Sequence, residues 1–212
     1  MKRTLLLLAV ALVAPAVAHA TTATATAQAE LQAGSAAYQR GDYQQALADF
    51  RQLAAQGNAA AEFGLGGMYN DGQGVPQNYA EALKWYRLAA AQGVAHAETN
   101  LGVMYNDGQG VPQNNAKALK WYRLAAAQGV ARAEFDLGGM YAEGQGVPED
   151  YVNAYKWLLL AKAETSATDA LYPRVTKGVR FLATMMTPAQ IAQAQQEASA
   201  WFAAHEPAGR VP

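Results

Sequence analysis

Apolar residues in the middle of the chain recur at the spacing of an α-helix. Ala61, Leu65 and Met68 are separated by four and three residues, so a helix over residues 59–70 presents them on one face. A second helix, over residues 79–92, places four further positions on a similar face: Ala82, Trp85, Leu88 and Ala89. The pattern therefore predicts two amphipathic helices in close succession, each with one apolar stripe to bury.

Polar residues and glycines mark the ends of these helices. Asn78 is the expected N-cap of the second helix, Glu81 completes a capping box, and Gly93 suits the left-handed position after the helix end. Between the helices, residues 71–76 contain two glycines and a proline, which exclude a helix there. We expect Val75 in this connector to pack back under the helix pair.

This two-helix pattern occurs three times with a period of 36 residues, at residues 59–94, 95–130 and 131–166. The first two copies are identical at 30 of 36 positions, and the second and third at 18. Glycine in a helix costs about 1 kcal/mol relative to alanine, so its recurrence in the first helix indicates close contact with a neighbouring helix. The glycines concerned are Gly64, Gly66, Gly67, Gly102, Gly138 and Gly139.

Segments on both sides of the three copies look like caps. Residues 29–58 form a shorter helix pair in which Asp42 caps the second helix, and residues 167–206 form C-terminal capping helices, followed by a tail at 207–212. Thr187 and Gln190 form a capping box for the last helix. The expected inward-facing positions in the C-terminal cap are Val175, Val179, Leu182, Ile191, Ala194, Ala198 and Trp201. Because one pair cannot bury its own apolar face, the sequence predicts an all-α fold, an α-solenoid of about five stacked antiparallel helix pairs in a right-handed superhelix.

The N-terminus has the pattern of a secretory signal peptide. A short basic start precedes an apolar run over residues 5–13, and Ala18-His19-Ala20 is the small-x-small motif that a signal peptidase accepts. We expect residues 1–20 to be removed and residues 21–28 to lack regular structure. The protein is then exported, to the periplasm or to the extracellular medium, and has no transmembrane segment. The alternative is an ordinary buried N-terminal helix.

Charge and cysteine content exclude several classes of function. The chain of 212 residues has 16 Lys and Arg against 17 Asp and Glu, so it lacks the excess positive charge of a nucleic-acid-binding protein. It has no cysteine, which excludes disulfides, thiolate metal sites and cysteine nucleophiles. An exported protein of this kind must be stabilised by packing alone.

The repeated frame LGxMYxxGxGVxxxxxxAxxWxxxAAxxG resembles the Sel-one-like repeat family, which is related to the tetratricopeptide repeats. Its copies begin at Leu65, Leu101 and Leu137. The resemblance implies an α-solenoid that holds other macromolecules; similar bacterial proteins are often exported and serve envelope assembly, polysaccharide export, motility or host contact. The third copy departs from the frame, because Leu158-Leu159-Leu160 replaces Tyr122-Arg123-Leu124 and the terminal glycine is lost. We expect this copy to contact the C-terminal cap.

No pattern points to catalysis, a cofactor or a metal. His96 and His205 are the histidines that follow Ala20, and no serine lies in a nucleophile elbow. The connectors supply one carboxylate each, too few for a calcium site: Asp71, Asp107 and Glu143. Three further carboxylates recur so strictly that a structural or solvated role is favoured over glycoside cleavage: Glu62, Glu98 and Glu134. The Gly-x-Gly of each connector lacks a P-loop lysine and is a folding element.

The recurring aromatic residues are either core or stacking platforms for sugars. Helical spacing favours a core position for the tryptophans and for the tyrosine of each first helix: Trp85, Trp121, Trp157, Tyr69, Tyr105 and Tyr141. The choice is open for Tyr86 and Tyr122.

Positions that differ between the copies are free to carry function, and in this architecture the first helices line the concave face. The candidate partner-binding residues are Phe63, His96, Thr99, Asn100, Asn106, Arg132, Phe135 and Asp136. The alternative is sequence drift on a solvated face. We therefore predict an exported, non-catalytic scaffold that binds a protein or peptide in the cell envelope. A glycan- or peptidoglycan-binding module is the second hypothesis, and an envelope hydrolase the third.

Overall fold

The computed structural model describes residues 14–205, and the side chains of residues 25–205. This part of the chain forms ten α-helices and contains no β-strand. Residues 1–13 and 206–212 lie outside the described range, and with them most of the predicted signal peptide and the predicted tail. Cleavage after Ala20 stays a prediction.

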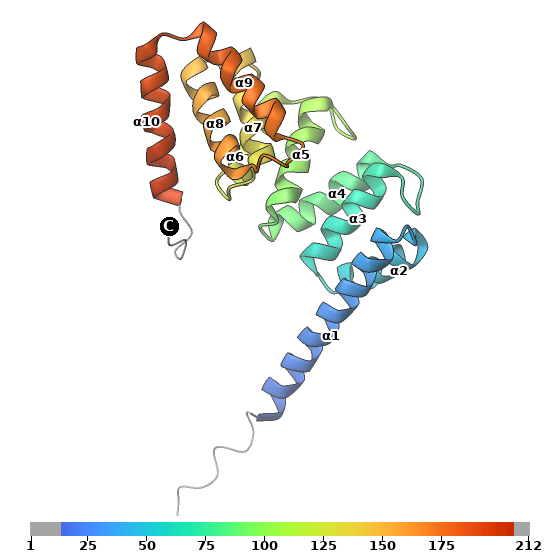
Figure 1. Ribbon diagram of the computed structural model, residues 1–212. Coiled ribbons are helices and arrows are strands. Elements are labelled where there is room, and N and C mark those ends of the chain that lie inside the picture. Colours follow the sequence, from blue (N-terminus) through green and yellow to red (C-terminus); the bar gives the residue numbers. More distant parts are fainter. Residues whose placement is uncertain (1–13, 206–212) are drawn as a thin grey trace, which may run out of the picture.

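The first eight helices form four consecutive pairs that stack side by side into an elongated, curved array (Figure 1). Within each pair the two helices pack closely, and each second helix also packs against the first helix of the next pair. The pairs are α1 (Ala14–Gln39) with α2 (Tyr43–Ala54), α3 (Ala59–Asp71) with α4 (Tyr79–Ala91), α5 (Ala95–Asp107) with α6 (Asn115–Ala126), and α7 (Ala131–Glu143) with α8 (Tyr151–Glu164). The predicted all-α solenoid is confirmed.

The last two helices, α9 (Tyr172–Met185) and α10 (Pro188–His205), depart from the predicted fifth pair. α9 packs against α8 as the first helix of another repeat would, but α10 packs mainly against α8 instead of α9. Trp201 of α10 meets Trp157 of α8 edge to face, with 4.8 Å between ring centroids. The C-terminal cap therefore consists of two helices that flank α8.

Helix α1 is longer than the sequence predicts at its N-terminal end. It begins at Ala14 and so includes residues 21–28, for which no regular structure is expected. Every second residue there is alanine through most of the segment, and alanine has the highest helix propensity. A helix that is already paired with α2 further along can propagate through such a segment at low cost.

The predicted helix ends are confirmed with one exception. The Asn78 side chain accepts hydrogen bonds from the backbone N–H groups of Ala80 and Glu81, and Gly93 has φ +82°. The reciprocal half of the capping box is not made, because the Asn78 N–H donates to the Tyr69 carbonyl at 2.8 Å. At α10 the capping box is complete, with Gln190 and Thr187 each accepting from the other's backbone N–H.

Close helix contact explains some of the recurring glycines but not all. A Cβ atom on Gly66 or Gly102 would lie 2.5 Å from a tyrosine ring of the following helix. Gly138 has the same relation to Leu158, and Gly64 is close to the ring of Phe50. The prediction is wrong for the two remaining glycines, since a Cβ on Gly67 meets only a hydroxyl at 3.9 Å and one on Gly139 meets nothing within 4 Å.

Adjacent repeats join through the glycine loops. Each loop has a glycine with φ near +70° whose α-carbon faces the first backbone turn of the preceding second helix. A Cβ added there would lie 2.9 Å or less from a backbone atom. The pairs are Gly74 with Tyr43, Gly110 with Tyr79 and Gly146 with Asn115. Val75 packs beside the first of these joints, as predicted.

The first helices bury the predicted stripe of residues. The second helices bury a face that is rotated from the predicted one. Ala61, Leu65 and Met68 are fully buried. On α4 and α6 the buried aromatic residues are Tyr86 and Tyr122, while Trp85 and Trp121 are half-buried and Leu88 is exposed. Each second helix packs on two neighbouring first helices, so its apolar face is wider than one stripe and includes the tyrosine.

The leucines at one repeat position show how much α10 contributes to burial of the second helix. Leu88 and Leu124 are each 43% exposed, whereas Leu160, at the same repeat position on α8, is fully buried in the cluster that includes Ala198 of α10. We expect Leu160→Ala to lower the free energy of unfolding by about 3 kcal/mol and Leu124→Ala by less than about 1 kcal/mol. Urea denaturation of the two variants tests this. Equal losses would show that α10 does not seal this face.

Candidate functional site on the concave face

The first helices of the repeats form the inner side of the curve. α5 lies against α7 as well as against its immediate neighbours, which brings consecutive first helices together along one surface. All eight predicted partner-binding residues are on these helices, and the structure places them in four different environments.

Two of the predicted residues line a cavity of about 680 Å³ at the N-terminal ends of α5 and α7. His96 and Arg132 are exposed there, and the same cavity is lined by Asp169, from the segment that joins α8 to α9, and by Arg174 in the first turn of α9. The Arg132 guanidinium pairs with Asp136 at 2.8 Å. Burial raises the pKa of Asp136, and the neighbouring Arg132 opposes that shift. The cavity therefore has a polar, mixed-charge wall.

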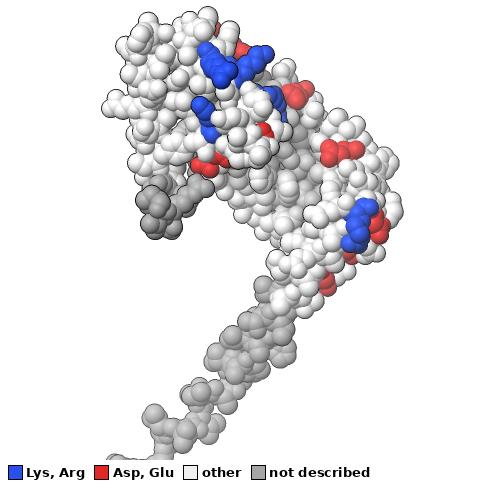
Figure 2. Space-filling view, in the orientation of Figure 1, with Lys and Arg blue, Asp and Glu red and all other residues white. Residues whose placement is uncertain are grey.

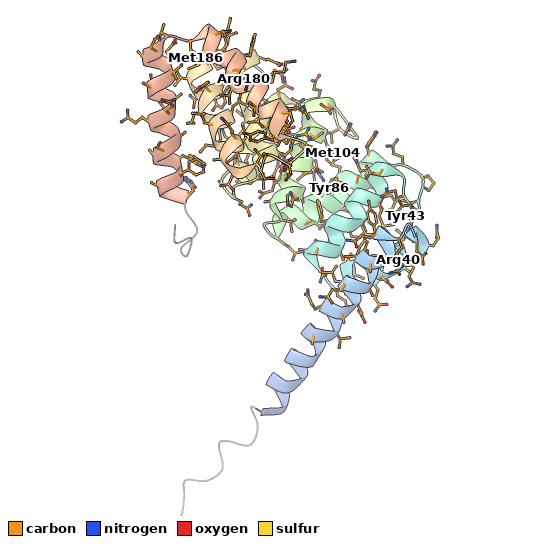
Figure 3. The ribbon with its side chains drawn as sticks, viewed as in Figure 1. Arg40, Tyr43, Tyr86, Met104, Arg180 and Met186 are labelled. Atoms are coloured by element: carbon orange, nitrogen blue, oxygen red, sulfur yellow. The ribbon has the colours of Figure 1, made fainter. Side chains whose placement is uncertain are left out.

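Two further predicted residues, Phe63 and Asn100, contact Tyr86 inside the array. Phe63 lies 5.9 Å from the Tyr86 ring and 6.3 Å from the His96 ring, measured between ring centroids. Asn100 forms a side-chain hydrogen bond with Tyr86. Figure 3 shows Tyr86 near Met104, with which it shares a buried cluster. Burial raises the pKa of the Tyr86 hydroxyl above its usual range. Tyr86 and Tyr122 are buried core residues, so neither has an exposed ring face on which a sugar could stack.

Two predicted residues are occupied within their own helix. Thr99 is buried, and its hydroxyl donates to the Ala95 carbonyl one turn earlier at 3.0 Å. Asn106 is half-buried and donates to the Asp107 carboxylate at 3.0 Å. Thr99 is therefore removed from the concave contact surface, because a buried hydroxyl with an internal partner has nothing to offer a ligand.

An apolar groove with a volume of about 470 Å³ lies between α7 and α9. Phe135, another of the predicted residues, lines it together with Leu158. The other wall was not predicted from the sequence, and in it Phe181 is 62% and Met185 52% exposed. Both residues lie off the buried stripe of α9, and this departure from the stripe is the signal that could have identified them.

The groove exists because the third repeat has a smaller side chain at one position. Tyr86 and Tyr122 fill the space behind Gly66 and Gly102 in the first two repeats. The equivalent Leu158 lies between Gly138 of α7 and Gly178 of α9 and is 2.8–2.9 Å from the positions that their Cβ atoms would take. A leucine side chain is shorter than a tyrosine side chain, so apolar space is left open between α7 and α9.

Positive charge lies along the α9 side of this groove, whereas Glu143 of α7 is also in its lining. α9 carries Arg174, Lys177 and Arg180 and no acidic residue, and Figure 2 shows blue side chains gathered over α9. The Arg174 guanidinium lies 4.8 Å from the centre of the Phe135 ring, a cation–π contact. An apolar groove with a basic border suits a polypeptide segment that combines apolar and acidic side chains.

The described residues show no arrangement typical of a metal site. Within residues 25–205 no three His, Asp or Glu side chains gather in a way that could hold an ion. His96 and His205 line different cavities. No helix in the described part of the chain has the length and apolar content needed to cross a membrane.

The three repeats match those of known proteins. The sequence model of the Sel1 repeat matches residues 59–94, 95–130 and 131–165. A solved Sel1 repeat protein from Oxalobacter formigenes is 31% identical over 81% of this chain and 68% of its own, with a TM-score of 0.67. A protective antigen present in uropathogenic Escherichia coli strains, which displays an SLR fold, is 26% identical over 85% of this chain, with a TM-score of 0.58. This chain spans 46% of the length of that antigen. No curated protein matches the chain.

Proposed function

Because the chain belongs to the Sel1 repeat family, whose members are generally scaffolds for protein interaction, we propose that it is an exported adaptor of the cell envelope that holds a partner polypeptide on its concave face. The partner segment places an apolar side chain in the groove between α7 and α9. The cations of α9 pair with acidic side chains beside it.

One observation carries the proposal. Phe181 and Met185 are the most exposed large apolar side chains in the described part of the chain, and both border the same groove. A partner that covers them gains about 25 cal/mol for each Å² of apolar surface removed from water. Arg174 and Lys177, in the same wall, orient an acidic segment and exclude a basic one.

Site-specific photo-crosslinking in intact cells tests this. A crosslinking residue in place of Phe181 is expected to give a discrete protein adduct, and one in place of Leu124, an exposed leucine outside this groove, is expected to give none. Leu158→Tyr restores the tyrosine of the other repeats and fills the groove. It should reduce the adduct about tenfold, the effect of losing about 1.4 kcal/mol of binding energy.

Equal adducts from both positions, or an adduct that Leu158→Tyr leaves unchanged, would contradict binding in this groove. Circular dichroism and urea denaturation of Leu158→Tyr must show an intact fold for the comparison to count.

Export is tested separately. The apolar start and the Ala18-His19-Ala20 motif support the proposal that the protein leaves the cytoplasm. Mass spectrometry of the protein from fractionated cells should find an N-terminus at Thr21 in the periplasmic fraction or the medium. A full-length chain confined to the cytoplasm would contradict export and leave the groove proposal standing.

A further inference from the structure

A partly buried hydrogen bond closes one end of each of the first two repeats. Glu62 and Glu98, in the first turns of α3 and α5, are both buried. Each accepts a hydrogen bond on Oε2 from the Nε2 amide of a glutamine that follows the paired helix, Gln92 and Gln128 respectively, at 2.8 Å. The recurring glutamates are therefore structural acceptors, and the glutamine supplies the N–H donor that each carboxylate needs.

The third repeat keeps the acceptor and loses the donor. Glu134 is 2% exposed, but the residue equivalent to Gln92 and Gln128 is Glu164. The Oε2 atom of Glu134 is buried without a hydrogen-bond partner. Burial, with a smaller contribution from the negative charge of Glu164, raises the pKa of Glu134 to about 8. A buried carboxyl oxygen without a donor is costly, so this site has an unmet need for an N–H or O–H group.

A cavity lies at this end of the third repeat. Glu134 and Glu164 line a space of about 440 Å³, whose other walls are Trp201 and Phe202 of α10 and the turn after α6. In the first two repeats no helix like α10 is present to form such a wall. The site therefore combines two carboxyl groups with aromatic surface, and it lies apart from the apolar groove between α7 and α9.

We propose that this cavity binds an organic cation, an ammonium or guanidinium group on a short apolar stem. The N–H groups of the cation take the place of the missing glutamine amide and donate to Glu134, and the stem lies against Trp201 and Phe202. The ligand is either a lysine or arginine side chain of a partner or a free amine, which present the same chemistry. The inference does not depend on the proposed groove.

The composition of the cavity wall favours this class of ligand over others. Two carboxyl groups are too few for a calcium site, which takes six to eight oxygen ligands. An anion would be repelled by both carboxylates. The titratable groups that line the cavity are Glu134 of α7, Glu164 of α8 and His205 of α10, and the turn after α6 contributes Gln128 without a charge. His205 stacks on Trp201 with 3.8 Å between ring centroids.

The proposal is tested by titration calorimetry of the full chain with three probes, at a pH above the pKa of Glu134. Butylammonium represents a free amine, arginine blocked at both ends represents a partner side chain, and pentanol is the uncharged control. We expect one or both cations to bind and pentanol not to bind. Binding of blocked arginine alone identifies a partner side chain, and binding of butylammonium identifies a free amine.

The repeats supply matched variants. Glu164→Gln restores the residue found at this position in the other repeats, and Glu134→Gln removes the negative charge and replaces one acceptor oxygen with an amide N–H donor, so each should weaken cation binding at least about tenfold. Gln92→Glu creates the same acidic pair with Glu62 in the first repeat, away from this cavity, and should add no second binding site, because α10 provides the aromatic wall only at the third. Denaturation curves confirm that the variants fold.

The proposal is overturned if neither cation binds the wild-type chain at millimolar concentration. It is also overturned if folded Glu134→Gln and Glu164→Gln both bind as tightly as the wild type.

Discussion

Gly110→Ala should lower the free energy of unfolding by about 4 kcal/mol. Gly110 has φ +68°, a conformation that costs a residue with a side chain about 1–2 kcal/mol. The added methyl group would also lie 2.6 Å from the backbone of Tyr79 at the joint between the first two repeats. Backbone atoms cannot move aside as the end of a side chain can, so relief requires the repeats to shift, at a further cost of about 1–3 kcal/mol.

Gly129→Ala is the matched control for this joint. Gly129 has φ +75°, but a Cβ there meets nothing within 4 Å, so the expected loss is the conformational cost alone, about 1–2 kcal/mol. Urea denaturation of both variants separates the two effects. Similar losses for Gly110→Ala and Gly129→Ala would mean that the contact with Tyr79 does not constrain the joint.

Glu134→Gln should stabilise the protein above pH 8 by about 5 kcal/mol. Because burial raises the pKa of Glu134 to about 8, the folded state holds a proton that the unfolded state has already released. Between the unfolded pKa of about 4.3 and the folded pKa, stability therefore falls as the pH rises, by about 1.4 kcal/mol for each pH unit. An amide at this position has no charge to bury, so the variant lacks this part of the pH dependence.

The sign and the pH window of this effect are both measurable. Denaturation of wild type and Glu134→Gln should give nearly equal stabilities below about pH 4, with the gap opening steadily toward pH 8. Glu62→Gln is the control, because the Glu62 carboxylate accepts a hydrogen bond from Gln92, and its replacement should lower stability instead. A gap between Glu134→Gln and wild type that is constant with pH would rule out a titrating Glu134 as its cause.

Helix positions and their ends could be predicted because each repeat specifies them locally. The N-cap at Asn78, the left-handed Gly93 and the capping box at Thr187 depend on residues within one turn of each other. The period of 36 residues then carries the same local solution through three copies. The fold class follows, since helix pairs of this kind can bury their apolar faces only by stacking.

Features that depend on how one helix packs against another could not be predicted from the sequence. Gly66 and Gly67 are adjacent and identical in type, and only the orientation of the following helix shows that Gly66 alone is in close contact. The course of α10 over α8 is likewise a matter of tertiary packing, and with it the burial of Leu160. Neither is visible in a pattern of 36 residues.

Only part of the candidate site could be predicted, for the same reason. Comparison of the repeats identified Phe135, which lines the groove between α7 and α9. It could not identify Phe181 or Met185, because α9 lies outside the repeats and has no equivalent with which to compare it. The binding role of the predicted residues stays a prediction.

The glycine joints have a consequence for how an array of this kind can grow. The unit that contains α3 and α4 offers its neighbours the same two surfaces as the unit that contains α5 and α6, and both are joined through an equivalent glycine. Tandem duplication of the unit at residues 59–94 should therefore lengthen the array by one pair and leave both ends unchanged. An insertion after Glu164 would instead have to displace α10, so the protein can be extended from its interior but not from its C-terminal end.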